Sequence, residues 1–123
     1  MSAWRVALVA CLVAACSTSA SRADNDALCS ALSSDLKGTS LAATPSAEQA
    51  AAAARRLDAR VTQLADQGLH DAVVRLHQHL HDIDVAWRKR GPADVARATA
   101  RARADAEQAA RACKLASDAF VSE

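Results

Sequence analysis

Residues 69–92, LHDAVVRLHQHLHDIDVAWRKRGP, form the most strongly patterned segment of this 123-residue chain. Large apolar side chains recur there every three or four residues, which is the spacing of one face of an α-helix. We expect this stripe to face a core and Gly91-Pro92 to end the helix near Arg90. The stripe consists of Leu69, Val73, Leu76, Leu80, Ile83 and Trp87.

A shorter helix is predicted near the N-terminal side, over residues 24–37. Leu28, Leu32 and Leu36 recur at every fourth position, so they share one face of that helix. Gly38 follows directly and is a natural left-handed helix stop.

A second helix is predicted between the loop at residues 38–43 and the long third helix. Thr44-Pro45 is typical of an N-cap followed by proline at the first helical position. We expect this helix to continue to Gln67 and to stop at Gly68. Its apolar seam consists of Ala50, Ala54, Leu57, Val61 and Leu64.

A fourth helix is predicted from Pro92 to Val121, about 45 Å long if straight. Its seam is heptad-like and consists of Val95, Thr99, Ala102, Ala106, Ala109, Cys113, Ala116 and Phe120. Alanine at most seam positions implies that the helix backbones approach closely.

The predicted fold class is all-α. Three long helices joined by tight turns, with the short N-terminal helix packed on them, form a small antiparallel helical bundle over residues 24–123. No segment shows the alternation typical of a strand. An open alternative is a long helical hairpin that completes its core by forming a homodimer.

The N-terminus has the proportions of an export signal. Arg5 precedes an apolar run over residues 6–15, and about ten apolar residues suit a signal peptide. A membrane-spanning helix needs about twenty apolar residues, so this run is too short to remain as a spanning anchor.

The end of this run, Val13-Ala14-Ala15-Cys16, resembles the lipobox of bacterial lipoproteins. In that family a signal peptidase cuts before a cysteine that carries a diacylglyceryl group. The resemblance implies that residues 1–15 are a removed signal peptide, that Cys16 is lipidated, and that residues 16–23 are a tether. Such a tether reaches less than about 30 Å, so the domain would stay near the membrane.

A rival match, Leu8-Val9-Ala10-Cys11, would leave an apolar region of roughly five residues, which is too short for export. Cleavage of an ordinary secretory signal nearby is the other alternative. The chain also resembles small Ala-rich helical lipoproteins of GC-rich, actinobacterial-type bacteria. That resemblance implies the outer face of the plasma membrane, or the outer membrane where the source has one, because Ser17 permits outer-membrane sorting.

The cysteine count is consistent with an exported, lipidated protein. Cys11 leaves with the signal, and Cys16 is used by the lipid, so Cys29 and Cys113 remain as one pair. An extracytoplasmic compartment permits disulfides. Both cysteines lie on the predicted core faces of their helices, and a bridge is worth about 4 kcal/mol in the chain-entropy treatment. Two buried thiols, or a share in a metal site, are the alternatives.

Charge and composition argue against nucleic acid as a partner. Loss of Arg5 leaves fourteen basic against fourteen acidic side chains, which gives no electrostatic footprint for a polyanion. Only Trp87 and Phe120 remain as aromatic residues, so no base-stacking platform is expected. The cluster Arg88-Lys89-Arg90 complements the C-terminal end of a helix dipole and is available to anionic lipid headgroups.

Four histidines, His70, His77, His79 and His81, are the one local feature that suggests chemistry. His77 and His81 lie one helical turn apart, so their rings can converge on one ion. We expect His70 and Asp84 to assist, since both lie on the same flank, whereas His79 points elsewhere. Imidazole and carboxylate suit zinc, copper or nickel, and an axial haem ligand is a less favoured alternative.

Structural histidines paired with neighbouring carboxylates are the competing interpretation, and no catalytic motif is present in the sequence. The leading functional expectation is therefore a non-enzymatic, lipid-anchored helical module that acts through an envelope protein or other envelope contacts. The alternative is a lipoprotein that binds a metal through its histidine-rich third helix.

Overall fold

The computed structural model describes residues 25–122. This part of the chain contains four helices: a first helix over residues 25–36, α2 (Ala47–Val61), α3 (Gln67–Lys89) and α4 (Pro92–Ala112). No strand occurs within these residues. The predicted all-α fold class is confirmed.

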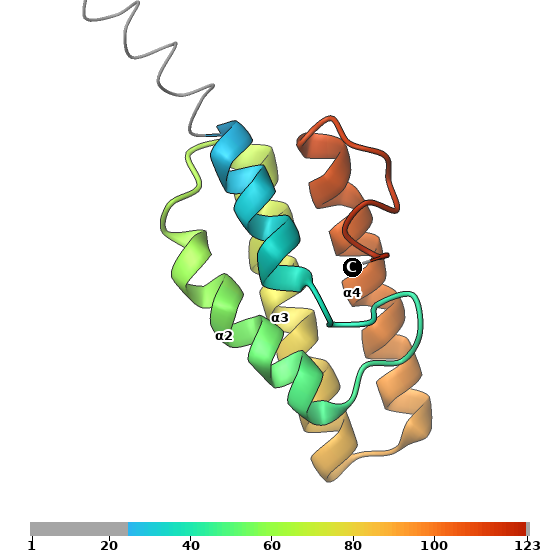
Figure 1. The fold of residues 1–123 in the computed structure, drawn as a ribbon. Coiled ribbons are helices and arrows are strands. Elements are labelled where there is room, and N and C mark those ends of the chain that lie inside the picture. Colours follow the sequence, from blue (N-terminus) through green and yellow to red (C-terminus); the bar gives the residue numbers. More distant parts are fainter. Residues whose placement is uncertain (1–24, 123) are drawn as a thin grey trace, which may run out of the picture.

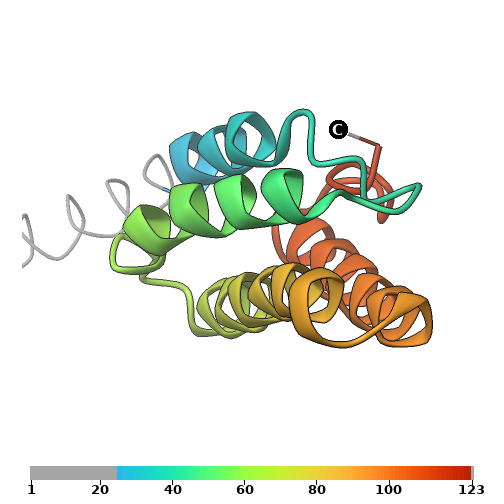
Figure 2. The same cartoon turned by 90° about the horizontal axis from the view of Figure 1, so that it is seen from below.

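The helices form a small bundle of two layers. The first helix lies beside α2 in one layer, and α3 and α4 form the other (Figures 1 and 2). Consecutive helices run in opposite directions, so α2 and α4 are parallel to each other (Figure 1). The principal helix contacts join α3 to α4 and α2 to α3, as expected for an antiparallel bundle.

The first helix follows the prediction closely. Leu32 and Leu36 are fully buried, and Leu28 packs against the core at its edge. The helix ends before Gly38, whose φ of 79° lies in the left-handed region that favours glycine. The three leucines therefore account for how this helix docks.

The predicted start of α2 is wrong by two residues. Ser46, rather than Thr44, is the N-cap, because a complete capping box forms there. The Ser46 hydroxyl accepts a hydrogen bond from the Gln49 backbone N–H at 3.1 Å, and the Gln49 side chain accepts one from the Ser46 N–H at 2.8 Å. This reciprocal pair satisfies two amides and outweighs the proline signal.

The boundary between α2 and α3 is also displaced from the prediction. The second helix ends at Val61, and Asp66 caps α3 by accepting a hydrogen bond from the Leu69 N–H at 2.8 Å. Gly68 therefore lies within the first turn of α3 and is no helix stop. A short link over residues 62–66 lets Leu64 turn into the core.

The apolar stripe of α3 is buried as predicted over its first five members, from Leu69 to Ile83. Trp87 is the exception, because 47% of its surface is exposed. It lies at the end of the stripe, where its indole N–H donates a hydrogen bond to the backbone oxygen of Pro45 at 2.8 Å. The expectation that Trp87 faces the core is thus wrong.

The fourth helix is shorter than predicted. It ends at Ala112, where Lys114 adopts a left-handed φ of 58°. The Leu115 N–H donates to the Ala110 oxygen and the Lys114 N–H to the Arg111 oxygen, both at 2.9 Å, which is a Schellman motif.

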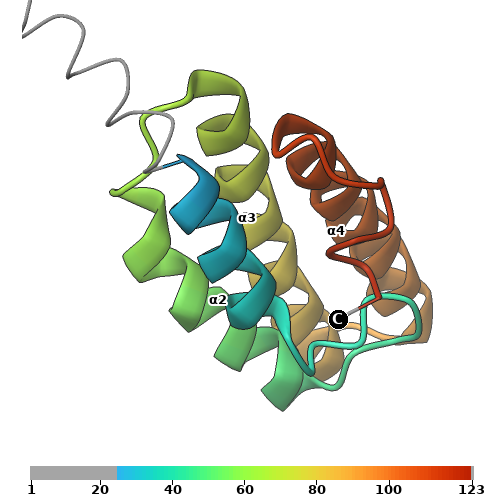
Figure 3. The ribbon, with the colours of Figure 1, turned by 45° about the horizontal axis from the view of Figure 1, so that its top comes forward.

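The remaining residues, 113–122, turn back toward the loop over residues 37–46 (Figure 3). Phe120 and Val121 are buried in the core, although Phe120 was expected on the continuing face of the helix. Arg103 of α4 donates a hydrogen bond to the backbone oxygen of Leu41 at 2.8 Å and holds this loop against α4.

Candidate functional sites

The lipidation site lies outside the described residues, so the lipobox around Cys16 stays a prediction. Residue 25, where the description starts, lies at one end of the bundle. The start of α3 and the end of α4 lie at the same end (Figure 1). We call this the disulfide end, because it also holds the bridge between Cys29 and Cys113.

The predicted bridge between Cys29 and Cys113 is confirmed. The two sulfur atoms are bonded, and the two Cα atoms are 5.9 Å apart. The bridge joins the first turns of the first helix to the C-cap of α4, across 84 positions of sequence. Both cysteines pack against the core at its edge and stay partly exposed.

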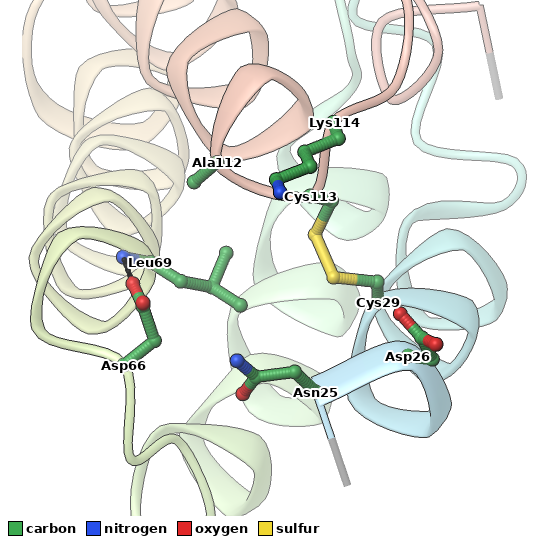
Figure 4. Close-up of a pocket in the computed structure, with 8 residues that line it drawn as sticks. All are labelled: Asn25, Asp26, Cys29, Asp66, Leu69, Ala112, Cys113 and Lys114. Atoms are coloured by element: carbon green, nitrogen blue, oxygen red, sulfur yellow. Dashed lines mark hydrogen bonds between the residues drawn. A yellow bond between two sulfur atoms is a disulfide. The ribbon is translucent and has the colours of Figure 1, made fainter. Parts of the chain in front are cut away.

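A hollow of about 400 Å³ adjoins this bridge (Figure 4). Its charged lining consists of Asp26, Asp66 and Lys114, and Leu69 supplies its large apolar side chain. Asp66 is already engaged as the N-cap of α3. The hollow lies beside the disulfide, and Asn25, Asp26 and Lys114 supply its other polar side chains.

The structure distributes the predicted metal ligands over several partners. His77 Nε2 lies 3.8 Å from Asp58 Oδ1 of α2, and these two residues line one hollow together with His81. His70 Nδ1 lies 3.5 Å from Asp71, and Asp84 is bound by Arg88 at 2.7 Å.

Within residues 25–122, no three histidine, cysteine, aspartate or glutamate side chains are gathered so that they could hold a metal ion. The expectation that His70, His77, His81 and Asp84 converge is thus corrected. Seven residues separate His70 from His77, a rise of about 10 Å along a helix, which is too far for one ion. Asp84 is paired with Arg88.

A polar cluster that sequence reasoning missed lies between α3 and α4. Asp105, on α4, is only 7% exposed and forms a short hydrogen bond with His79 Nδ1. Arg75 Nε lies 3.7 Å from the other carboxylate oxygen, and Arg75 also donates to Gln108 at 3.0 Å. His79, which was predicted to point away from the other histidines, therefore joins α3 to α4, the two helices with the most extensive contacts.

A second missed cluster joins the first helix to α2. Asp35 is buried and accepts two hydrogen bonds from the Arg60 guanidinium, at 2.8 and 3.3 Å. Arg56 donates to the backbone oxygen of Asp35 at 2.6 Å. The hydrogen bonds from Arg60 to Asp35 raise the pKa of the guanidinium above its ordinary value, so Arg60 stays charged across the physiological range.

Compared with known proteins, the chain matches no family model, no curated protein and no solved structure. In the described part, none of the helices is both long and apolar enough to cross a membrane. The functional interpretation therefore rests on the residues of this chain.

Proposed function

We propose that the protein is a lipid-anchored helical module of the bacterial envelope, without enzymatic activity, that acts through protein or envelope contacts. The anchor is a diacylglyceryl group on Cys16, and the domain is the disulfide-linked bundle. The protein is held on the outer face of the plasma membrane, or on the outer membrane where the source has one.

The bond between Cys29 and Cys113 is the observation that carries this proposal. Structural disulfides belong to oxidising compartments outside the cytoplasm, in agreement with an export signal. Of the four cysteines, the bridge takes two, Cys11 would leave with the signal, and Cys16 would stand directly after the cleavage point. Each cysteine thereby has one assigned fate.

The place where the chain enters the bundle supports the same proposal. Residue 25 lies at the disulfide end, so a tether over residues 16–23 would join the lipid to the bundle at its bridged end (Figure 1). The bridge then connects the first structured helix after the anchor to the last helix of the domain.

The proposed absence of catalysis is supported by how the buried charged groups are used. Asp105 is paired with His79 and Arg75, and Asp35 with Arg60, each across a helix interface. These contacts account for both buried carboxylates as links between helices.

Metabolic palmitate labelling tests the anchor. The Cys16→Ser variant should lose the label and the membrane fraction, whereas the Cys11→Ser variant should keep both. Loss of label in Cys11→Ser alone would show that Cys11 carries the lipid in place of Cys16. Equal labelling of the parent protein and both variants would refute the anchor.

Metal binding is the second candidate, favoured by the shared position of His77, His81 and Asp58 around one hollow. Titration of the purified full chain with zinc and copper, beside His77→Ala/His81→Ala, tests it. These three side chains are not gathered closely enough to hold one ion together, so only weak binding is predicted. A sub-micromolar site that the double variant loses would make metal binding the function.

A further inference from the structure

A third hollow lies at the opposite end of the bundle from the bridge, where α3 passes into α4. Its volume is about 240 Å³, and its charged lining consists of Asp82, Arg90, Asp94, Arg97 and Arg101. Arg90 is the C-cap of α3, and Arg101 lies on α4, so two separate elements supply its basic groups. The hollow is therefore formed by the fold and not by one run of sequence.

The charges in this hollow do not cancel. Arg97 is paired with Asp94, which neutralises both side chains. The guanidinium groups of Arg90 and Arg101 have no hydrogen bond or ion pair within residues 25–122, and neither has the carboxylate of Asp82. Two free guanidinium groups thus face one free carboxylate.

Small side chains lie between these charges. Ala86 and Ala98 line the hollow and are almost fully buried, so no long side chain fills the space between the two helices. A volume of about 240 Å³ is below the roughly 300–1,000 Å³ of a pocket for a drug-sized ligand. The space suits one small polar group.

We propose that this hollow binds a phosphoryl group through the guanidinium groups of Arg90 and Arg101. A guanidinium presents a planar fork of donors that fits two phosphate oxygens. A phosphoryl group, as a diester or as free phosphate, presents non-bridging oxygens on different sides of the phosphorus, so it can engage both arginines at once despite the repulsion from Asp82. The site is independent of the lipid anchor.

The test is a calorimetric titration of the full chain, purified in a neutral detergent, with inorganic phosphate at low ionic strength. Glycerophosphoglycerol, the soluble headgroup of phosphatidylglycerol, is titrated in parallel. The variants are Arg90→Ala/Arg101→Ala and Asp82→Asn. The control is Arg111→Ala, which removes an exposed, unpaired arginine at the disulfide end.

Saturable binding should weaken at least about tenfold in the double arginine variant, because two charge-assisted contacts are lost. It should tighten in Asp82→Asn, where the repelling carboxylate is gone, and stay unchanged in Arg111→Ala. Tighter binding of the diester indicates a lipid headgroup as the natural source, and tighter binding of inorganic phosphate indicates a free anion.

Binding that survives in the double arginine variant, or that weakens equally in the Arg111→Ala control, would overturn the proposal. So would the lack of saturable binding for both probes. Circular dichroism of every variant shows whether the bundle is retained. Should the double variant fail to fold, Asp82→Asn keeps the test open, because unchanged or weaker binding there contradicts the proposed charge balance.

Discussion

Removal of the bridge between Cys29 and Cys113 should lower the stability of the domain severely. The bridge spans 84 positions, and closing a loop of that size restricts the unfolded chain by about 4.5 kcal/mol in the chain-entropy treatment. For a bundle of this size, each kcal/mol shifts the melting temperature by several degrees, so the Cys29→Ala/Cys113→Ala variant should melt about 20 °C below the parent.

Thermal unfolding followed by circular dichroism measures this shift. The parent protein treated with dithiothreitol is the matched control, since it should melt close to the alanine variant, and the variant itself should not respond to the reductant. A difference of less than about 5 °C would refute the reasoning, because it corresponds to only about 1 kcal/mol. The unfolded chain would then be compact enough that the bridge restricts it little.

Three further predictions concern the polar clusters and the glycines. The His79→Ala variant should lose about 2 kcal/mol of stability in urea unfolding, because it leaves Asp105 buried without its nearest partner. The His79→Ala/Asp105→Ala variant should lose less stability than the two single variants added together. Gly68→Ala should stabilise the domain by about 0.5–1 kcal/mol, since Gly68 is helical and its new Cβ would meet only ordinary contacts. Gly38→Ala should destabilise the domain by about the same amount, because the φ of 79° at this position favours glycine. The raised pKa of Arg60 means that the stability contributed by its charged form is lost only in strongly alkaline solution, so Arg60→Ala should cost the same stability at about pH 6 and at about pH 10.

The helices were predictable from the sequence because their apolar residues follow the helical period. The leucines of the first helix and the stripe from Leu69 to Ile83 are buried as their spacing requires. The bridge was predictable because the two cysteines that follow the predicted signal and lipidation site both lie on predicted core faces of their helices. Both results depend on periodicity and counting, which are local properties of the chain.

Helix ends were predicted less well. Neighbouring residues compete to cap the same helix end, and the presence of one favourable residue type does not show which of them forms the cap. Gly68 is predicted as the stop of α2, but Asp66 already caps α3 two residues earlier. The end of α4 has no glycine at all: Lys114 occupies the left-handed position of the Schellman motif. Such a residue gives no signal in the sequence.

The polar clusters were missed for another reason, since they join residues far apart in the chain. Asp105 occupies a seam-flanking position among alanines, and nothing local indicates that His79 lies opposite it. Asp35 likewise lies directly before Leu36 in the first helix, and it meets Arg60 of α2 only after the first helix has docked. The arrangement of helices decides these pairs, so a sequence pattern alone cannot.

The first helix shows why both kinds of contact are needed. With twelve residues it is at or below the roughly 12–15 residues at which an isolated helix becomes marginal in water, so it depends on its neighbours. The bridge fixes its start to α4, and Asp35 fixes its end to α2 through Arg56 and Arg60. If Cys16 carries the lipid, any pull on the tether reaches this helix first. The disulfide then lies at the tethered end of the helix, where a pulling force would break a hydrogen bond. The ion pair and hydrogen bonds of Asp35 lie at the other end.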